Sequence, residues 1–155
     1  MLIPVSGVMR NRPMERPRPQ MGTENGVVVK RVLAFVIDVV LLAVVVGVVG
    51  AIFGALLGRV GAILTPLLGL VGIVYFIYLE GTYGQTLGKR FTGIVVVDED
   101  GGACDMTASA IRNVLRIVDA LPTLYIVGFA VMYLVSDRKQ RVGDLVGDTV
   151  VVETA

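Results

Sequence analysis

Two long apolar runs dominate the pattern of hydrophobic and polar positions along this chain. The first covers residues 31–57 and contains, after Arg31, only one charged residue, Asp38. About 26 otherwise uncharged residues are enough for a helix that crosses a hydrocarbon core of roughly 30 Å. The second run covers residues 60–80 and follows a very short connection at Gly58–Gly61. The pattern therefore predicts two transmembrane helices joined as a tight hairpin.

The second half of the chain predicts shorter elements. Residues 106–121 place polar side chains on one face of a helix and apolar side chains on the other. Pro122 ends or kinks this helix, and a more apolar helix is predicted at about 123–136. β-Branched runs predict strands at about 91–98 and 148–153, and these two strands are natural partners because a lone strand leaves its backbone groups unpaired.

Strand pairing constrains how often the second half crosses the membrane. If both strands lie on one side, residues 107–135 must cross an even number of times. About 29 residues give roughly 43 Å of helix, against roughly 60 Å for two full crossings. We therefore expect a re-entrant helical hairpin or two short, tilted helices hinged near Pro122. An interfacial helix followed by one crossing is the alternative. The predicted fold class is an all-α, polytopic membrane bundle with a small cytoplasmic β-hairpin-like strand pair.

The predicted domains are a tail and a single membrane domain. Residues 1–26 are rich in Arg and Pro and bury little apolar surface, so we expect a disordered basic tail. Residues 27–155 form the membrane domain. The natural start of the chain is either Met1 or Met21.

Charge distribution predicts the orientation. Of the 14 Lys and Arg residues, 13 fall in segments expected on one face of the membrane, and only Arg59 falls on the other. By the positive-inside rule, both termini are expected to be cytoplasmic in a multi-pass protein of the cell (inner) membrane. The chain has no His and one Cys, Cys104. An internal disulfide and a zinc site of the usual kind are excluded. We expect no cofactor, no metal, no nucleic-acid partner and no enzymatic activity.

Asp38 is the residue that this layout must explain, because it lies about two turns inside the apolar run. Burying its charge there costs about 3 kcal/mol on insertion scales. Intramembrane charges tend to pair with one another, so we expect Asp38 to pair with Arg112 or Arg116 across helices. Asp38 belongs either to a functional site that faces the bundle interior or to a buried ion pair with Arg31 or another Arg that only fixes helix packing, and the two readings are equally open. The candidate ligand or ion-pair site consists of Arg31, Asp38, Arg112, Arg116, Asp119 and Asp144.

A stripe of small residues marks another face of the first predicted helix. Gly50, Gly54 and Gly58 recur at every fourth position, a spacing that lets helices pack closely. This stripe faces either the second apolar helix or a second subunit, so a homo-oligomer or other membrane proteins are expected partners besides the lipid bilayer.

Four segments together resemble the RDD family of small bacterial membrane proteins. They are RVLAFVID at 31–38, GTYGQTLGKRFTGIVVVD at 81–98, IRNVLRIVDALP at 111–122 and QRVGDLVGDTVVV at 140–152. The resemblance maps the Arg of the family motif to Arg31 and its first Asp to Asp38. The second Asp maps to Asp144, with Asp119 as the rival. The last two apolar runs are closer together here than is usual in the family.

The resemblance implies a membrane protein whose role is unsettled, with transport of ions or small ligands suggested for similar proteins. Two hypotheses follow: transport that uses an intramembrane Arg/Asp site, and a non-catalytic scaffold or accessory subunit whose Arg/Asp pairs hold helices together. An enzyme is disfavoured because the sequence shows no nucleophile with a base and no metal cluster.

Overall fold

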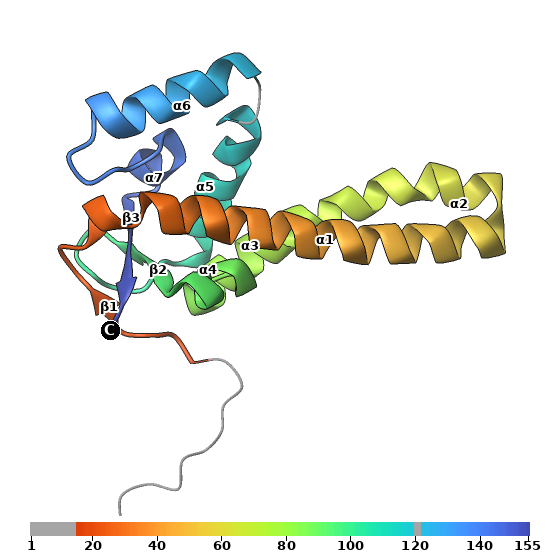
Figure 1. Cartoon of the computed structure of the whole chain (residues 1–155), viewed down its shortest axis with the longest axis horizontal. Helices are drawn as coiled ribbons and strands as arrows, with labels where there is room; N and C mark the ends of the chain where they lie inside the picture. Colours follow the sequence, from red (N-terminus) through yellow and green to blue (C-terminus); the bar gives the residue numbers. More distant parts are fainter. Residues whose placement is uncertain (1–14, 120–121) are drawn as a thin grey trace, which may run out of the picture.

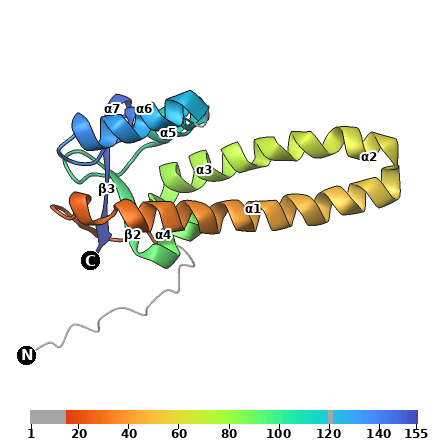
Figure 2. The same cartoon turned by 45° about the horizontal axis from the view of Figure 1, so that its top comes forward.

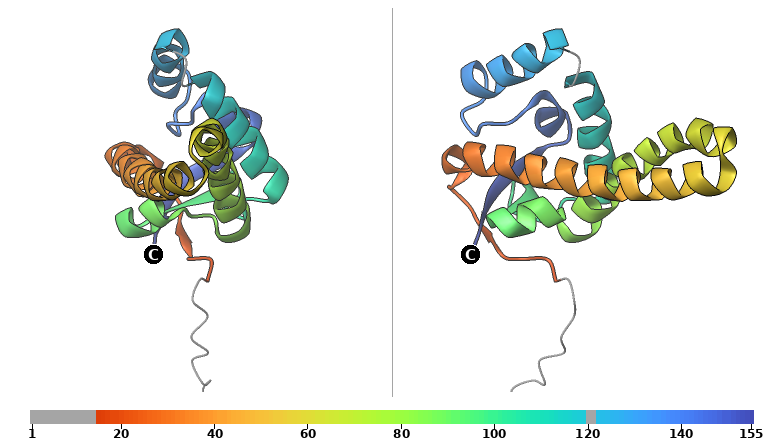
Figure 3. Two further views of the ribbon diagram at one scale, coloured as in Figure 1. Left: turned by 90° about the vertical axis from the view of Figure 1, so that its right-hand side faces the viewer. Right: turned by 45° about the vertical axis from the view of Figure 1, so that its right-hand side comes forward.

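The computed structural model describes residues 15–119 and 122–155. It is mostly helical and has two parts, a long apolar hairpin and a compact end from which the hairpin projects (Figure 1). The hairpin consists of α1 (Val28–Leu57) and a return formed by α2 (Arg59–Leu64), a 3₁₀ turn η2 (Thr65–Leu68) and α3 (Gly69–Tyr83). Both arms are long and apolar enough to cross a membrane. Figure 2 and Figure 3 show the hairpin and the compact end from other sides.

Glycines shape the far half of the hairpin. Gly58 ends α1 with a positive φ of 56°, a conformation that glycine adopts without strain. Gly61 lies so close to α1 that a Cβ there would be 2.1 Å from the Phe53 carbonyl oxygen. Of the expected stripe, Gly50 lies against Thr65, whereas a Cβ at Gly54 would meet nothing within 4 Å. The return arm is not one regular helix, because η2 contains Pro66, which has no N–H for a helical bond.

The compact end carries two short helices after the hairpin. α5 (Met106–Asp119) packs on α3, and the Ser109 hydroxyl donates to the Ile77 carbonyl at 2.7 Å. α6 (Pro122–Leu134) then runs back over the first half of α1 (Figure 1). With 14 and 13 residues, each helix is only about 20 Å long. Neither is long enough to span a bilayer alone.

The compact end also contains a small antiparallel sheet, whose strand order is β1-β3-β2. β2 (Ile94–Asp98) pairs with β3 (Thr149–Thr154), with Val96 opposite Val151. The predicted strand pair is confirmed. β2 begins at Ile94 and not at the expected residue 91, because α4 (Leu87–Thr92) comes directly before it. Gly93 ends that helix with a φ of 69°. Side chains from both faces of the β2–β3 pair are buried, and Cys104 joins the cluster around Ile94 and Val151.

The expectation of a disordered tail over residues 1–26 is wrong for residues 15–26, while 1–14 lie outside the described residues. β1 (Pro19–Gln20) adds a third strand at the β3 edge, and η1 (Glu24–Gly26) leads into α1. Arg16 donates hydrogen bonds to the carbonyl oxygens of Gly81, Thr82 and Cys104. These polar contacts hold the segment even though it buries little apolar surface.

Candidate functional site

Asp38 lies where α4 crosses α1, and its carboxylate is almost fully buried. It accepts hydrogen bonds from the Tyr75 hydroxyl at 2.7 Å, the Thr86 hydroxyl at 2.5 Å and the Gly88 N–H at 2.8 Å. Thr86 is the N-cap of α4, so two of the three donors come from the start of that helix. The carboxylate therefore fastens α4 and α3 to α1.

The approach of α4 to α1 depends on Gly88. A Cβ at this position would lie 2.1 Å from the Ala34 carbonyl oxygen and 2.8 Å from the Asp38 carboxyl carbon. Only a residue without a side chain brings its N–H this close to Asp38. We regard Gly88 as part of the site.

The expected pairing of Asp38 with Arg112 or Arg116 is wrong in this structure, and Arg31 is not its partner either. The hydrogen-bond donors that reach Asp38 among the described residues are the neutral groups given above. The three arginines are engaged by Asp144 and Glu80 instead. Helical spacing placed Arg31 and Asp38 on one face, but it could not show that other carboxylates lie closer to the guanidinium groups.

Asp144 is the carboxylate that joins the two ends of the chain. It lies in α7 (Val142–Val146), is buried, and forms ion pairs with Arg31 and with Arg112, the latter at 2.9 Å. Burial alone would raise the pKa of Asp144, but the Arg112 and Arg31 guanidinium groups hold it well below its usual range. Burial alone would lower the pKa of Arg112, but the Asp144 and Glu80 carboxylates raise it above its usual value. Arg31, Arg112 and Asp144 thus belong to one cluster.

Glu80 forms the centre of a second ion-pair cluster that sequence reasoning missed. Its carboxylate is fully buried at the end of α3 and pairs with Lys89 of α4. Arg116 Nη2 lies 3.5 Å from Glu80 Oε1, and Arg112 Nη2 lies 3.8 Å from Oε2. Burial lowers the pKa of Lys89 to about 8, because the Glu80 charge offsets desolvation only in part. Arg112 therefore bridges the Glu80 and Asp144 clusters.

Two aromatic rings lie against the guanidinium group of Arg116. The Arg116 guanidinium carbon lies 4.5 Å from the ring centre of Phe76 and 5.7 Å from that of Phe35. Such stacking is favourable for a guanidinium group that is partly removed from water. Asp119 ends α5, but its side chain lies outside the described residues, so its expected role stays a prediction.

The space within these clusters is small. One cavity of about 10 Å³ is lined by Asp38, Phe35, Phe76 and the cationic side chains Arg31, Lys89, Arg112, Arg116 and Arg141. A second cavity of the same size adjoins Asp144. Each has room for about one water molecule. Over the described part of the chain, no group of three His, Cys, Asp or Glu side chains is placed to hold a metal ion.

Comparison with known proteins gives one family. The model of the RDD family matches residues 26–148 of this chain. Searches of curated proteins and of solved structures found no match.

Proposed function

Since this chain belongs to the RDD family and is membrane-associated, we propose that it is a multi-pass scaffold or accessory subunit of the cell membrane. In this proposal the buried ion pairs and the Asp38 hydrogen bonds hold the compact end rigidly on a two-helix anchor. The compact end and the exposed hairpin faces then bind a second copy or other membrane proteins. The chain performs no catalysis.

Helix length supports the placement of the hairpin in the bilayer. The part of α1 beyond Asp38, residues 39–57, extends about 28 Å, close to the thickness of a hydrocarbon core. Its apolar side chains are mostly exposed, for example Val40, Val44 and Leu56. Asp38 then lies at the membrane boundary rather than two turns inside it. This position lowers the cost of its charge.

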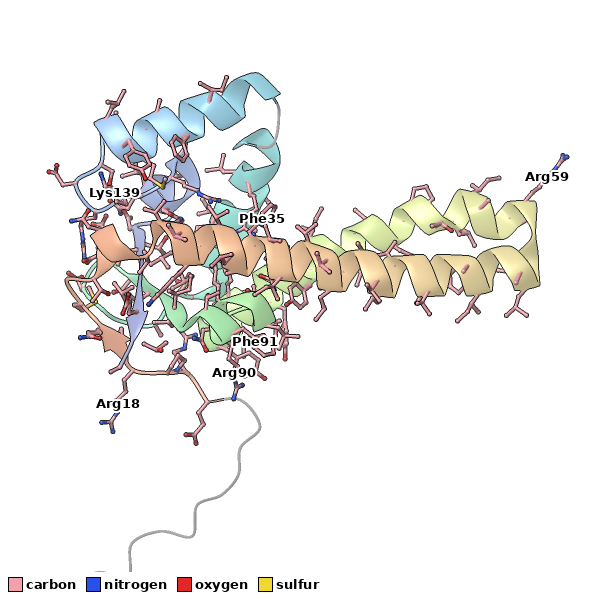
Figure 4. All side chains as sticks on the ribbon, viewed as in Figure 1. Arg18, Phe35, Arg59, Arg90, Phe91 and Lys139 are labelled. Atoms are coloured by element: carbon pink, nitrogen blue, oxygen red, sulfur yellow. The ribbon has the colours of Figure 1, made fainter. Side chains whose placement is uncertain are left out.

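The distribution of basic residues supports the orientation. Arg59 lies at the tip of the hairpin, whereas Arg18, Arg90 and Lys139 lie at the compact end (Figure 4). By the positive-inside rule, the compact end and both termini are then cytoplasmic.

The observation that carries the scaffold proposal is the hydrogen bonding of Asp38. All three donors that reach it belong to segments that it fastens together, and the adjoining cavity is only about 10 Å³. A carboxylate held in this way is suited to joining helices. A space of this size leaves no room for a hydrated ion or a solute.

Transport is the second candidate function, and one observation favours it. Asp38 accepts its hydrogen bonds from neutral groups and lines a cavity, so its carboxylate is not committed to one of the ion pairs described above. Carboxylates within membrane proteins often mark ion and proton pathways.

Reconstitution into vesicles that contain a pH- or sodium-sensitive dye separates the two functions. For the scaffold, we expect no flux above that of protein-free vesicles, together with recovery of an oligomer or a membrane-protein partner in mild detergent. Flux that Asp38→Asn abolishes, and that the exposed-site control Asp137→Asn retains, would replace the scaffold proposal with transport.

A further inference from the structure

Two arginines of the site keep N–H groups that no described residue accepts. Nε and Nη1 of Arg112 and Nη1 of Arg116 are buried without a hydrogen-bond partner. Arg112 is only 4% exposed, so bulk water does not serve these donors. Buried donors of a charged group are costly when unpaired, which indicates that an acceptor is missing from this place.

The local charge indicates that this acceptor is negative. Three buried carboxylates, those of Asp38, Glu80 and Asp144, face five cations. The cations that line the small cavity are Arg31, Lys89, Arg112, Arg116 and Arg141, of which Arg116 and Arg141 are partly buried. A cluster with more positive than negative charge is stabilised by an added anion.

A larger, mostly apolar cavity adjoins this cationic cluster. It measures about 260 Å³ and lies between the start of α1 and α6, lined by Val28, Val32, Gly128, Phe129 and Met132. Arg31 and Arg141 line this apolar cavity and both small cavities. The apolar space therefore ends at the cations. Its lining side chains Val32 and Phe129 are about half exposed, so the space is open on one side.

We propose that this cavity and the cationic cluster together bind one anionic phospholipid. One of its acyl chains lies between α1 and α6, and the phosphate lies at Arg31 and Arg141, with an oxygen directed to the unpaired N–H groups of Arg112 and Arg116. Such an occupant matches the apolar lining, the excess positive charge and the water-sized space at the inner end. A free inorganic anion matches the charge alone and leaves the apolar cavity unfilled.

The position along α1 places the phosphate at headgroup level. Arg31 lies in the first turn of α1, about 10 Å before Asp38, where the apolar stretch that matches the bilayer core begins. Val28 and Val32 lie on the same side of Asp38 as Arg31, so the acyl chain between α1 and α6 bends away from the bilayer core. This inference depends on the membrane association of the chain and holds for a scaffold or a transporter alike.

The test compares retention of two lipids by the purified full-length protein in detergent, measured by native mass spectrometry. The lipids are phosphatidylglycerol, which is anionic, and phosphatidylcholine with the same acyl chains. We expect phosphatidylglycerol to be retained at least about fivefold better, and Arg116→Gln to lower its retention by about fivefold. Val32→Trp, which fills the apolar cavity without changing charge, should lower it similarly. Val44→Trp, on an exposed position of the same helix, should leave it unchanged.

A third arm uses inorganic phosphate alone, followed by thermal unfolding. Little stabilisation by phosphate, with clear stabilisation by phosphatidylglycerol, supports the lipid. Equal retention of the two lipids would overturn the proposal. Selective retention that survives both Arg116→Gln and Val32→Trp would place the lipid elsewhere and overturn it too. Stabilisation by phosphate that equals that by the lipid would assign the site to a free anion instead.

Discussion

At the scale of single residues, buried carboxylates decide how the compact end is held. Asp38 is hydrogen-bonded by neutral donors, whereas Glu80 and Asp144 are paired with cations. The sequence drew attention to Asp38 because it interrupts an apolar run. It gave no comparable signal for Glu80 or Lys89, since a charge at the end of a predicted span is usually exposed at the membrane surface. Both residues are buried because α4, which carries Lys89, packs on α1 and brings Lys89 against the Glu80 carboxylate at the end of α3.

Replacement of Asp38 tests its role as a fastening group. Asp38→Ala leaves the hydroxyls of Tyr75 and Thr86 and the N–H of Gly88 without their acceptor. We expect a loss of about 2–4 kcal/mol in unfolding free energy, measured in detergent by denaturant or thermal unfolding. Asp38→Asn keeps one acceptor oxygen and should lose less. Asp137→Ala, at an exposed carboxylate, serves as the control. An Asp38→Ala protein as stable as the control would show that Asp38 does not hold α4.

The ionisation of Asp144 makes the free energy of unfolding depend on pH in the acidic range. Its pKa in the folded protein is well below the value of 3.8 expected when unfolded, so the unfolded chain binds the proton first. The stabilisation is fully present above about pH 4 and is lost as the pH falls toward the folded pKa. We expect Asp144→Asn to be less stable at pH 7 by about 3–5 kcal/mol, because it leaves Arg31 and Arg112 buried without this carboxylate. Its melting temperature should also change less than that of the unaltered protein between pH 5 and pH 3. An equally steep acid dependence in both proteins would contradict this assignment.

At the scale of elements, the long and the strongly patterned segments were predictable. The two apolar arms, the amphipathic α5 and the β2–β3 pair follow from hydrophobic periodicity and β-branched runs. α4 and α7 could not be predicted in this way, because helices of six and five residues are too short to show a hydrophobic period. Thr86 ahead of Leu-Gly-Lys is a helix N-cap signal that would have located α4. β1 was missed because its two residues pair with an edge that only the folded sheet presents.

The close contact of α4 with α1 gives a test at this scale. Gly88→Ala should push α4 away from Ala34 and break the hydrogen bond from the Gly88 N–H to Asp38, because the new methyl group overlaps backbone atoms. We expect a loss of about 1–3 kcal/mol in unfolding free energy. Gly69→Ala is the matched control, since a Cβ there meets nothing within 4 Å. A Gly88→Ala protein as stable as Gly69→Ala would mean that α4 packs differently.

At the scale of the whole molecule, the structure combines one apolar hairpin with a polar, ion-paired end (Figure 3). α5 and α6 belong to that end, and each is about 20 Å long, shorter than the roughly 30 Å of a hydrocarbon core. Residues from both ends of the chain meet there: Arg31 pairs with Asp144, and Lys30 with Glu153 at 2.7 Å. Because both ends of the described chain meet at the compact end, the side of the membrane on which this end lies follows directly from the number of crossings.

Single-cysteine labelling answers that question. Arg59→Cys places a thiol at the tip of the hairpin, and Arg18→Cys places one on the exposed start of the compact end. The natural Cys104 is buried, and burial raises the pKa of its thiol, so its background reactivity is low. In spheroplasts, we expect a membrane-impermeant maleimide to label Arg59→Cys at once and Arg18→Cys only after lysis. Labelling of both from the same side would contradict a hairpin that crosses twice, and the charge asymmetry would then have to be explained without the membrane.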